Sequence, residues 1–345
     1  MSDVSIILAV HNAERWLDDC LASVVEQNFS GKLELSIYLD ACTDSSEGII
    51  QCWKDKLAEK DITVIISGHQ DSCPRGAGFS KNRAVMQSSG KYLCILDADD
   101  VMCNDRIAQQ FAAAKSQPNS IIGCRFHRMP EGSTERYTKW ANTLSNDQLY
   151  TQAYTSHGPT LIMPTWFFER QVFNKVGGLD EGGKGVPEDL IFFYKHLELC
   201  GKLYCVEHDL LMYRYHPGSA TCSISEETIW RLRVDFIQRR VLDKWETFTI
   251  WNAGKQGRKL FRSLTPQNQK KVSAFCDVDE KKIAKKFYIY EESKERFKPK
   301  IPVIDFREAA PPFIICIKLD LTSGNFEKNI DSLKLLEGTD YFHFN

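Results

Sequence analysis

The stretch that decides the fold is YLCILDADDV, residues 92–101, an apolar run of strand length that ends on three carboxylates. A strand buried on both faces carries no polar residues until its carboxyl end, and ligands of open α/β sheets bind outside those ends. We therefore expect Asp97, Asp99 and Asp100 to lie where a ligand binds. Two carboxylates spaced i, i+2 can hold one hard divalent cation, which in turn can hold a diphosphate.

A second D-x-D triplet, Asp277-Val278-Asp279, also follows an apolar run. At ordinary Asp usage such a triplet arises by chance about once in a chain of this length. A D-x-D triplet alone is therefore weak evidence for a cation site. The residues that accompany each triplet decide which of the two triplets is functional. The second triplet lacks partners downstream, so we interpret it as a turn at the end of a strand.

Composition sets the broad class. The chain has 345 residues, 43% hydrophobic and 26% charged, which is ordinary for a soluble globular protein and long enough for two domains. Its twelve cysteines form no C-x-x-C pair and no even spacing, which argues against a zinc cluster and a disulfide framework. No basic or apolar leader precedes Val4, and no run of eighteen apolar residues occurs. We predict a cytoplasmic protein with reduced thiols and no membrane span.

The net charge of −2 hides an uneven distribution. Residues 1–254 carry 26 Lys/Arg against 33 Asp/Glu, residues 255–300 carry 14 against 6, and residues 301–345 carry 4 against 7. A basic block in so short a stretch is a candidate footprint for a polyanion. The alternative is an ordinary solvated helix face.

The N-terminal half alternates strand and helix. Apolar runs rich in β-branched residues predict strands over residues 4–10, 33–39, 62–66 and 92–96. Apolar residues at helical spacing predict helices over residues 16–25 and 49–57, and a short helix is expected over residues 81–87. Repeated units of this kind imply a mostly parallel sheet with right-handed crossovers. The polar clusters at residues 11–14, 40–45 and 97–100 then follow strand ends and can converge on one crevice.

Several short motifs occur in a characteristic order over residues 4–222. They are H-N-x-E at 11–14, D-x-C-T-D-S at 40–45, Lys81-Asn82 before L-D-A-D-D at 96–100, G-G-L-D-E at 177–181, P-E-D-L at 187–190, and Y-R-Y-H at 213–216 followed by Ser219. In this order they resemble the inverting nucleotide-sugar glycosyltransferases of the GT-A fold, the large glycosyltransferase 2 family. One departure is that Leu39 and Cys42 replace an Asp and a Ser of the family's turn.

The resemblance implies roles for particular residues. It implies a divalent cation, Mn²⁺ or Mg²⁺, with Asp99 as principal ligand and Asp97 oriented more toward the nucleotide. Asp40 is the carboxylate carried over for the uracil or ribose. His216 is a third ligand or a diphosphate contact, or else a structural histidine. The remaining residues expected to bind the nucleotide sugar are Ala9, His11, Asn12, Glu14, Lys81, Ala98, Trp166 and Glu188.

Three of these residues have structural alternatives. Lys81 faces the donor phosphates or lies on a solvated helix face. Trp166 stacks on a sugar ring or fills the core. Glu188 and Asp189 open a helix, where acidic residues are favoured by the helix dipole in any case. Because adjacent helical residues point about 100° apart, only one of the pair can face the acceptor. The resemblance selects Asp189 as the catalytic base.

A closer resemblance, over essentially the whole length and including Trp166 and W-N-A-G-K-Q-G-R at 251–258, is to members of this family that modify tRNA. It implies transfer of galactose from UDP-galactose to queuosine in the anticodon of tRNA(Tyr). An alternative is a cytosolic transferase for a protein, lipid or glycan acceptor. Another is a protein that binds UDP-sugar or tRNA without turnover.

The pattern changes past residue 225. We predict an α/β protein with three parts: a GT-A-type, mostly parallel, nucleotide-binding sheet flanked by helices at 1–225, a linking helix at 226–246, and a smaller Rossmann-like βαβ domain at 247–345. Its first turn lacks the first glycine of a dinucleotide fingerprint, with Asn252 in that place, so we predict a close turn without cofactor.

Two further groups are candidates for RNA contacts. Four lysines at i, i+1, i+4 and i+5 would share one helix face and could hold tRNA phosphates; they are Lys281, Lys282, Lys285 and Lys286. Unstacked anticodon bases are read by aromatic and polar groups, for which Tyr137, Trp140 and Trp166 are candidates.

Overall fold

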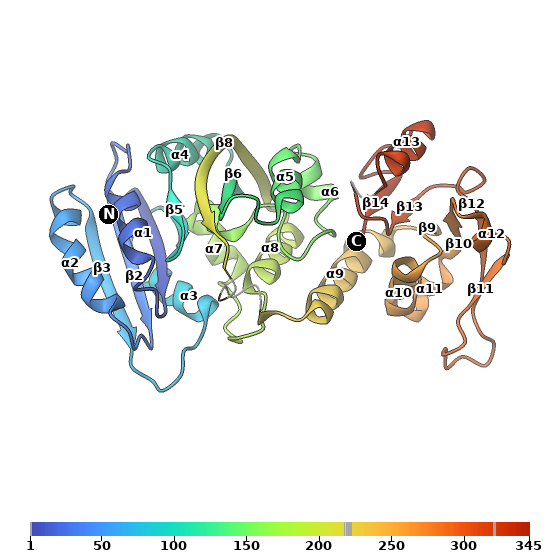
Figure 1. Cartoon of the computed structure of the whole chain (residues 1–345), viewed down its shortest axis with the longest axis horizontal. Helices are drawn as coiled ribbons and strands as arrows, with labels where there is room; N and C mark the ends of the chain where they lie inside the picture. The colour runs from blue at the N-terminus through green and yellow to red at the C-terminus, as the bar shows by residue number, and fades with distance from the viewer. Residues whose placement is uncertain (1, 217, 219–222, 320–321) are drawn as a thin grey trace. The chain divides into compact units, whose positions relative to one another are not determined.

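The computed structural model describes residues 2–216, 218, 223–319 and 322–345, so that Ser219 of the last motif lies outside the described residues. The chain forms two compact units (Figure 1). The first comprises Met1–Leu149 and Gly158–Ser225, and the second comprises Tyr150–His157 and Glu226–Asn345. The helix at the start of the second unit, expected as a separate linker, therefore clusters with the sheet that follows it. No helix in the described part of the chain is long and apolar enough to cross a membrane.

The first unit is built on an eight-stranded sheet with the order β3-β2-β1-β4-β7-β6-β8-β5. The expected parallel strands are confirmed as β1 (Val4–Val10), β2 (Leu33–Asp40), β3 (Thr63–His69) and β4 (Tyr92–Asp97). They are joined by α1 (Leu17–Val25), α2 (Ser46–Ala58) and α3 (Ala77–Gln87). Because parallel strands run the same way, the polar residues that follow β1, β2 and β4 meet at one edge of the sheet.

The other half of this sheet is mixed. Strand β7 runs antiparallel to β4 and β6, while β6 and β8 are parallel to each other. Before β7, a 3₁₀ turn begins at Met163, and the strand itself follows Trp166. The elements are β5 (Val101–Met102), α4 (Arg106–Ser116), β6 (Ser120–Met129), α5 (Glu135–Thr143), α6 (Gln148–Thr151), η1 (Met163–Thr165), β7 (Phe167–Glu169), α7 (Arg170–Val176), α8 (Glu188–Glu198) and β8 (Lys202–Arg214).

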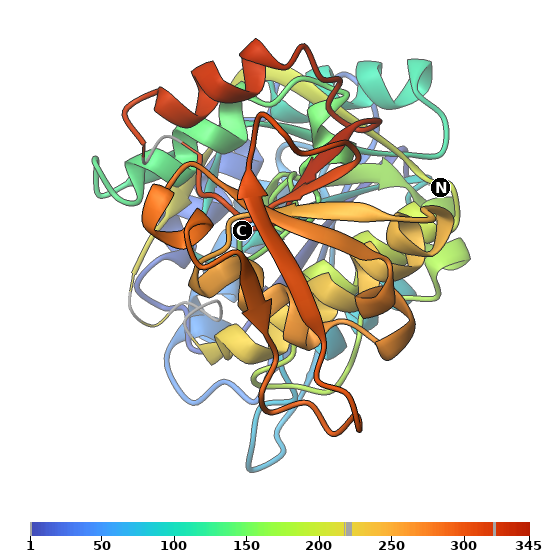
Figure 2. The same ribbon diagram turned by 90° about the vertical axis from the view of Figure 1, so that its right-hand side faces the viewer.

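The second unit contains a six-stranded sheet with the order β11-β12-β10-β9-β13-β14, seen facing the viewer in Figure 2. Only the β11–β12 pair is antiparallel, and the five other strands have the order of a doubly wound fold. The elements are α9 (Glu226–Arg240), η3 (Leu242–Lys244), β9 (Phe248–Trp251), α10 (Lys255–Ser263), α11 (Pro266–Lys270), β10 (Val272–Asp277), α12 (Glu280–Ile283), β11 (Phe287–Ile289), β12 (Lys300–Asp305), β13 (Phe313–Ile315), α13 (Asn325–Ser332) and β14 (Tyr341–His343).

The turn after β9 is closed by its own polar groups. Asn252 has φ 125°, its side-chain oxygen accepts from the Gly254 N–H at 2.7 Å, and its amide donates to the Cys316 carbonyl at 2.8 Å. A Cβ at Gly257 would lie 1.9 Å from the Asn252 carbonyl oxygen, so only glycine lets α10 approach so closely. Asp277 is buried and accepts from the Ala253 N–H at 2.9 Å. The second D-x-D triplet is therefore a turn at a strand end.

The expected face of four lysines is not formed. Helix α12 ends at Ile283, and Lys286 has φ 61°, which is not helical. Lys282 forms an ion pair with Asp277 at 2.9 Å. The prediction was wrong because a buried strand-end carboxylate draws one lysine inward and the helix is only four residues long. Lys281, Lys285 and Lys286 are exposed but do not share a helix face.

Glu34 joins three segments of the first unit. Its carboxylate accepts from the Ser5 hydroxyl and from the Ser89 N–H and hydroxyl, each at 2.7 Å. Burial acts to raise the pKa of Glu34, but the hydrogen bonds from Ser89 and Ser5 outweigh it and hold the pKa below its ordinary value.

We predict that Glu34→Gln lowers the free energy of unfolding at pH 7 by about 1–3 kcal/mol. Because the folded pKa is lowered, the charged group stabilises the fold above its unfolded pKa of about 4.3, and this contribution is lost as pH falls through the folded pKa. Urea unfolding from pH 7 to pH 3 should therefore give a gap between the two proteins that narrows in acid. A gap of constant size would contradict this account.

Candidate functional site

A buried ion pair lies at the carboxyl end of β4. The Lys81 Nζ atom on α3 is 2.6 Å from Asp97 Oδ1; the lysine side chain is 3% exposed and the carboxylate 29%. Burial opposes the charge of Lys81, but Asp97 and Glu188 outweigh it and raise its pKa. The solvated-face interpretation of Lys81 was therefore wrong. The Lys81 ammonium lies among acidic groups, and the nearest of them, Asp97, is partly exposed to solvent.

Two of these acidic groups begin α8. Pro187 is the N-cap residue, and Glu188 and Asp189 form the first turn. Burial raises the pKa of Glu188 to about 7, with repulsion from Asp189 added and Lys81 opposing. Burial also raises the pKa of Asp189. Two groups act to lower this pKa: the Leu190 N–H, which donates to Asp189 Oδ1 at 2.7 Å, and the nearby Lys81 cation. A carboxylate with a raised pKa is a better proton acceptor at neutral pH than an ordinary one.

Asp99 and His216 meet although they are 117 residues apart. Asp99 Oδ2 lies 2.9 Å from His216 Nε2, and both side chains are about a quarter exposed. The centroid of the Trp16 ring lies 5.6 Å from that of the His216 ring. The Arg214 guanidinium lies 4.5 Å from the centroid of the Trp16 ring. The sequence pattern placed Trp16 on the apolar face of a helix and did not predict that it lies beside His216. Its position directly after the polar loop that follows β1 was the available signal.

Asp100 serves as an anchor for β8. It is 1% exposed, and its Oδ1 atom accepts from the Arg214 N–H at 2.8 Å. The Arg214 side chain donates to the Asp99 carbonyl at 2.9 Å, which holds the chain leading to His216 against Asp99. Burial, with repulsion from Asp99 and Asp97, raises the pKa of Asp100 well above its ordinary value.

The residues at this site suit a divalent cation bound jointly with a ligand. No group of three His, Cys, Asp or Glu side chains that could hold a metal occurs in the described ranges. Asp99 and His216 offer one oxygen and one nitrogen, a pair that suits Mn²⁺ better than Mg²⁺. The buried Oδ2 atom of Asp100 has no hydrogen-bond partner among the described residues, so negative charge at this strand end is in excess. A cation fits that excess, with diphosphate oxygens and water as further ligands.

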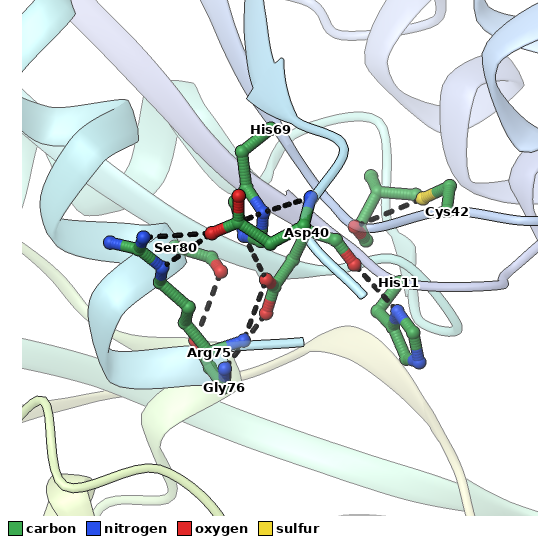
Figure 3. Close-up of polar contacts among 9 residues, drawn as sticks. His11, Asp40, Cys42, His69, Arg75, Gly76 and Ser80 are labelled. Carbon is green, nitrogen blue, oxygen red and sulfur yellow. Dashed lines mark hydrogen bonds and ion pairs between the residues drawn. The ribbon is translucent and has the colours of Figure 1, made fainter. Parts of the chain in front are cut away.

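The Asp40 carboxylate is already occupied by protein groups, as Figure 3 shows. It is 3% exposed and accepts from His69 Nε2 at 2.7 Å and from the Arg75 and Gly76 N–H groups at 2.8 Å each. Burial acts to raise the pKa of Asp40, but these hydrogen bonds outweigh it and lower the pKa. Asp40, expected to contact the uracil or ribose, thus directs its carboxylate to protein groups of its own unit. Its carboxylate holds the loop of residues 70–76.

Three exposed residues after β1 bind the turn after β2. His11 Nδ1 lies 2.6 Å from the Asp40 carbonyl oxygen, also drawn in Figure 3. Asn12 Oδ1 accepts from the Thr43 N–H at 2.8 Å, and Glu14 accepts from the Ser45 N–H at 2.9 Å. These contacts bring two of the expected clusters together. Two smaller predicted residues flank the carboxylates: Ala9 is the register partner of Asp97, and Ala98 follows it.

Trp166 belongs to the core. It is 1% exposed, and its Nε1 atom donates to the Leu161 carbonyl at 2.7 Å. Its ring packs against Phe168 and Phe192. Of the two interpretations of Trp166, the structure shows the core position, and an indole so buried cannot stack on a sugar or a base. Tyr137 and Trp140 are half-buried, with ring centroids 5.6 Å apart.

Comparison with known proteins identifies the class. The sequence model of glycosyl transferase family 2 matches residues 5–177, and the chain belongs to this family. The uncharacterized glycosyltransferase EpsJ of Bacillus subtilis is 23% identical over 226 residues, which cover 63% of this chain and 62% of EpsJ. The glycosyltransferase GlyG of Streptococcus pneumoniae is 20% identical over 226 residues, covering 63% of this chain and 72% of GlyG.

Solved structures show the same fold. TarS of S. aureus in complex with UDP-GlcNAc has a TM-score of 0.53 at 16% identity, covering 77% of this chain and 71% of TarS. A mannosyltransferase from Pyrobaculum calidifontis in complex with GDP-Man and Mn²⁺ has a TM-score of 0.50 at 15% identity, covering 70% of this chain and 66% of that protein. The GT-A-type fold expected from the sequence is confirmed.

We predict that Asp40→Asn releases the loop of residues 70–76, because an amide cannot accept as strongly from His69 and two N–H groups. Loss of hydrogen bonds to a charged group should raise trypsin cleavage after Arg75 about tenfold, read by peptide mapping. Asp71→Asn is the control, since it weakens the exposed contacts of Asp71 with Arg75 and His69 but leaves the Asp40 carboxylate in place. Equal cleavage of both variants would refute the role of Asp40.

Proposed function

We propose that the chain is an inverting, divalent-cation-dependent glycosyltransferase that moves galactose from UDP-galactose to queuosine in the anticodon of tRNA(Tyr), acting as a queuosine-tRNA galactosyltransferase. The observation that carries the enzymatic part is the position of Asp189: a half-buried carboxylate of raised pKa, in one cluster with Lys81 and the partly exposed Asp97. The acceptor and donor rest on the resemblance over the whole length. We also propose a cytoplasmic location, as its tRNA substrate requires.

Each carboxylate at the site has a distinct task in this proposal. Asp189 accepts the proton of the acceptor hydroxyl while that oxygen attacks the anomeric carbon. The bond from the anomeric carbon to the UDP oxygen breaks on the opposite face, and its electron pair leaves with UDP, so the configuration inverts. When bound by Asp99 and His216, a divalent cation supplies positive charge for the departing diphosphate. Lys81 holds Asp97 in place and limits how far burial raises the pKa of Asp189.

The donor residues are proposed from the same strand ends. His11, Asn12 and Glu14 are exposed beside the β2 turn, and Ala9, Ala98 and Glu188 border the carboxylates. The UDP-GlcNAc complex of TarS and the GDP-Man and Mn²⁺ complex of the mannosyltransferase support a nucleotide-sugar donor and a divalent cation, Mn²⁺ or Mg²⁺. For the acceptor, the basic stretch of residues 255–300 supports a polyanion such as tRNA, with Lys281, Lys285 and Lys286 exposed on it.

A second candidate acceptor is a glycan. The matched relatives include TuaG of Bacillus subtilis, a putative teichuronic acid biosynthesis glycosyltransferase 29% identical over 107 residues. Incubating the full chain with UDP-galactose, Mn²⁺ and queuosine-containing tRNA, then digesting the RNA, tests the acceptor by mass spectrometry. A hexose added to queuosine is expected. Binding of UDP-sugar without any adduct would favour the glycan acceptor or a binding protein without turnover.

For the base, we predict that Asp189→Asn lowers kcat by about 10²-fold or more, because a carboxamide cannot take the acceptor's proton. Binding of UDP-galactose, measured by calorimetry, should change little. Glu188→Gln is the matched control on the same helical turn and should retain more transfer. Because burial raises the pKa of Asp189, the acid limb of kcat/KM should lie above the ordinary range for Asp. Normal transfer by the Asp189 variant would reject this base.

For the cation, we predict that His216→Ala and Asp99→Asn each weaken Mn²⁺ binding in the presence of UDP by at least about tenfold, since each removes a ligand. Electron paramagnetic resonance of free Mn²⁺ measures this without reference to activity. Asp19→Asn is the control, because Asp19 pairs with Arg214 from an exposed position. Unchanged Mn²⁺ affinity in both ligand variants would remove the cation from these residues.

A further inference from the structure

The β11–β12 hairpin forms one edge of the second sheet, and its two faces differ. Tyr288 lies opposite Ile301, and both side chains are buried against the sheet's core. Successive residues of a strand point to opposite faces. Phe287 and Ile289 must therefore point outward, and each is 43% exposed. Apolar residues on the outer face of an edge strand are a liability that proteins normally avoid, so this face calls for a partner.

Cations accompany these apolar groups. Lys300 lies opposite Ile289 in the register, and its Nζ atom is 4.0 Å from the centroid of the Phe287 ring. Figures 1 and 2 both show the loop of residues 290–299 extending from this edge of the sheet. On that loop Phe297 is 79% exposed, with the Arg296 guanidinium 5.5 Å from its ring. Two aromatic rings are thus presented to solvent, each beside a positive charge.

The net charge of the hairpin is positive. Residues 285–300 contain six Lys/Arg and three Glu. Within the described part of the chain, the six form no ion pair with a carboxylate. They are Lys285, Lys286, Lys294, Arg296, Lys298 and Lys300. Their charge therefore remains available to an anionic partner.

The combination favours nucleic acid over other anionic partners. An anionic membrane would select a larger apolar face, usually one side of an amphipathic helix, whereas this hairpin exposes three separated apolar side chains. An acidic peptide would use the cations but not the faces of two rings. Unpaired nucleotides use both, because bases stack on aromatic rings and phosphates bind the cations.

We propose that the outer face of the β11–β12 hairpin and its loop bind unpaired RNA nucleotides, with Phe287 and Phe297 as stacking platforms and the surrounding Lys and Arg side chains as phosphate contacts. This inference rests on the proposed function for the identity of the RNA, which is the tRNA acceptor. It assigns the binding to an aromatic and basic strand edge instead of a lysine helix face.

The test measures binding of the full-length protein to a fluorescently labelled anticodon stem-loop RNA by anisotropy. We expect Phe287→Ala/Phe297→Ala to weaken binding about fivefold or more, as for the loss of a base–aromatic stack. Lys300→Gln should lower the salt dependence of binding by about 0.7 in the slope of log affinity against log salt. Leu336→Ala and Lys328→Gln, exposed positions near the opposite edge of this sheet, are matched controls expected to bind as the unmodified chain does.

The outcomes distinguish an RNA-binding hairpin from a membrane-binding one. Unchanged RNA affinity in the double variant overturns the inference. The inference also fails if the double variant loses binding to phosphatidylserine vesicles but still binds RNA, because the hairpin would then be a membrane-binding surface. If the double variant unfolds, Phe297→Ala alone carries the test, because its side chain projects from a loop. Transfer to free queuosine nucleoside is measured in parallel. RNA binding that depends on both rings, without transfer to any queuosine acceptor, would leave the inference standing and refute the proposed function.

Discussion

The ion pair between Lys81 and Asp97 is the constraint on which the site depends. An ammonium that is 3% exposed is stable only where carboxylates surround it, because removing a charge from water costs several kcal/mol. The pair fixes α3 against the end of β4 and draws the first turn of α8 toward the same point. Loss of one partner would leave a buried charge uncompensated, at a cost of about 3–5 kcal/mol. The site therefore assembles only when helix and strand ends are all in place.

The three carboxylates at the end of β4 have different partners, and only Asp100 is fully buried. Asp97 pairs with Lys81, Asp99 faces His216, and Asp100 is buried against the Arg214 N–H. Because Arg214 also binds the Asp99 carbonyl, the segment that follows β8 and carries His216 cannot move without disturbing both acids. Three neighbouring aspartates thereby form three different contacts: Asp100 with the Arg214 N–H, Asp99 with His216, and Asp97 with Lys81. Repulsion among them is what a bound cation would relieve.

The second unit shows how similar sequence signals take on other meanings. Asp277 follows a strand in a D-x-D triplet as Asp97 does, yet it is buried and accepts from Ala253 and Lys282. No carboxylate of that triplet faces a histidine among the described residues. Exposed aromatic and basic groups of this unit lie instead at one edge of its sheet, where Phe287 and Lys300 meet. Basic and aromatic side chains at that edge give the unit a surface suited to a partner.

The sequence by itself determined the parallel strands, the carboxylates at their ends and the opening of α8 at Glu188, because continuous apolar runs and strand ends are local patterns. Tertiary structure alone decided that Trp166 is buried, that Asp40 is occupied by His69 and the loop after it, and that Lys282 turns inward to Asp277. It also brought Trp16 beside His216. These outcomes depend on which groups meet across the fold, since a buried charge or indole is satisfied by partners that no local pattern identifies.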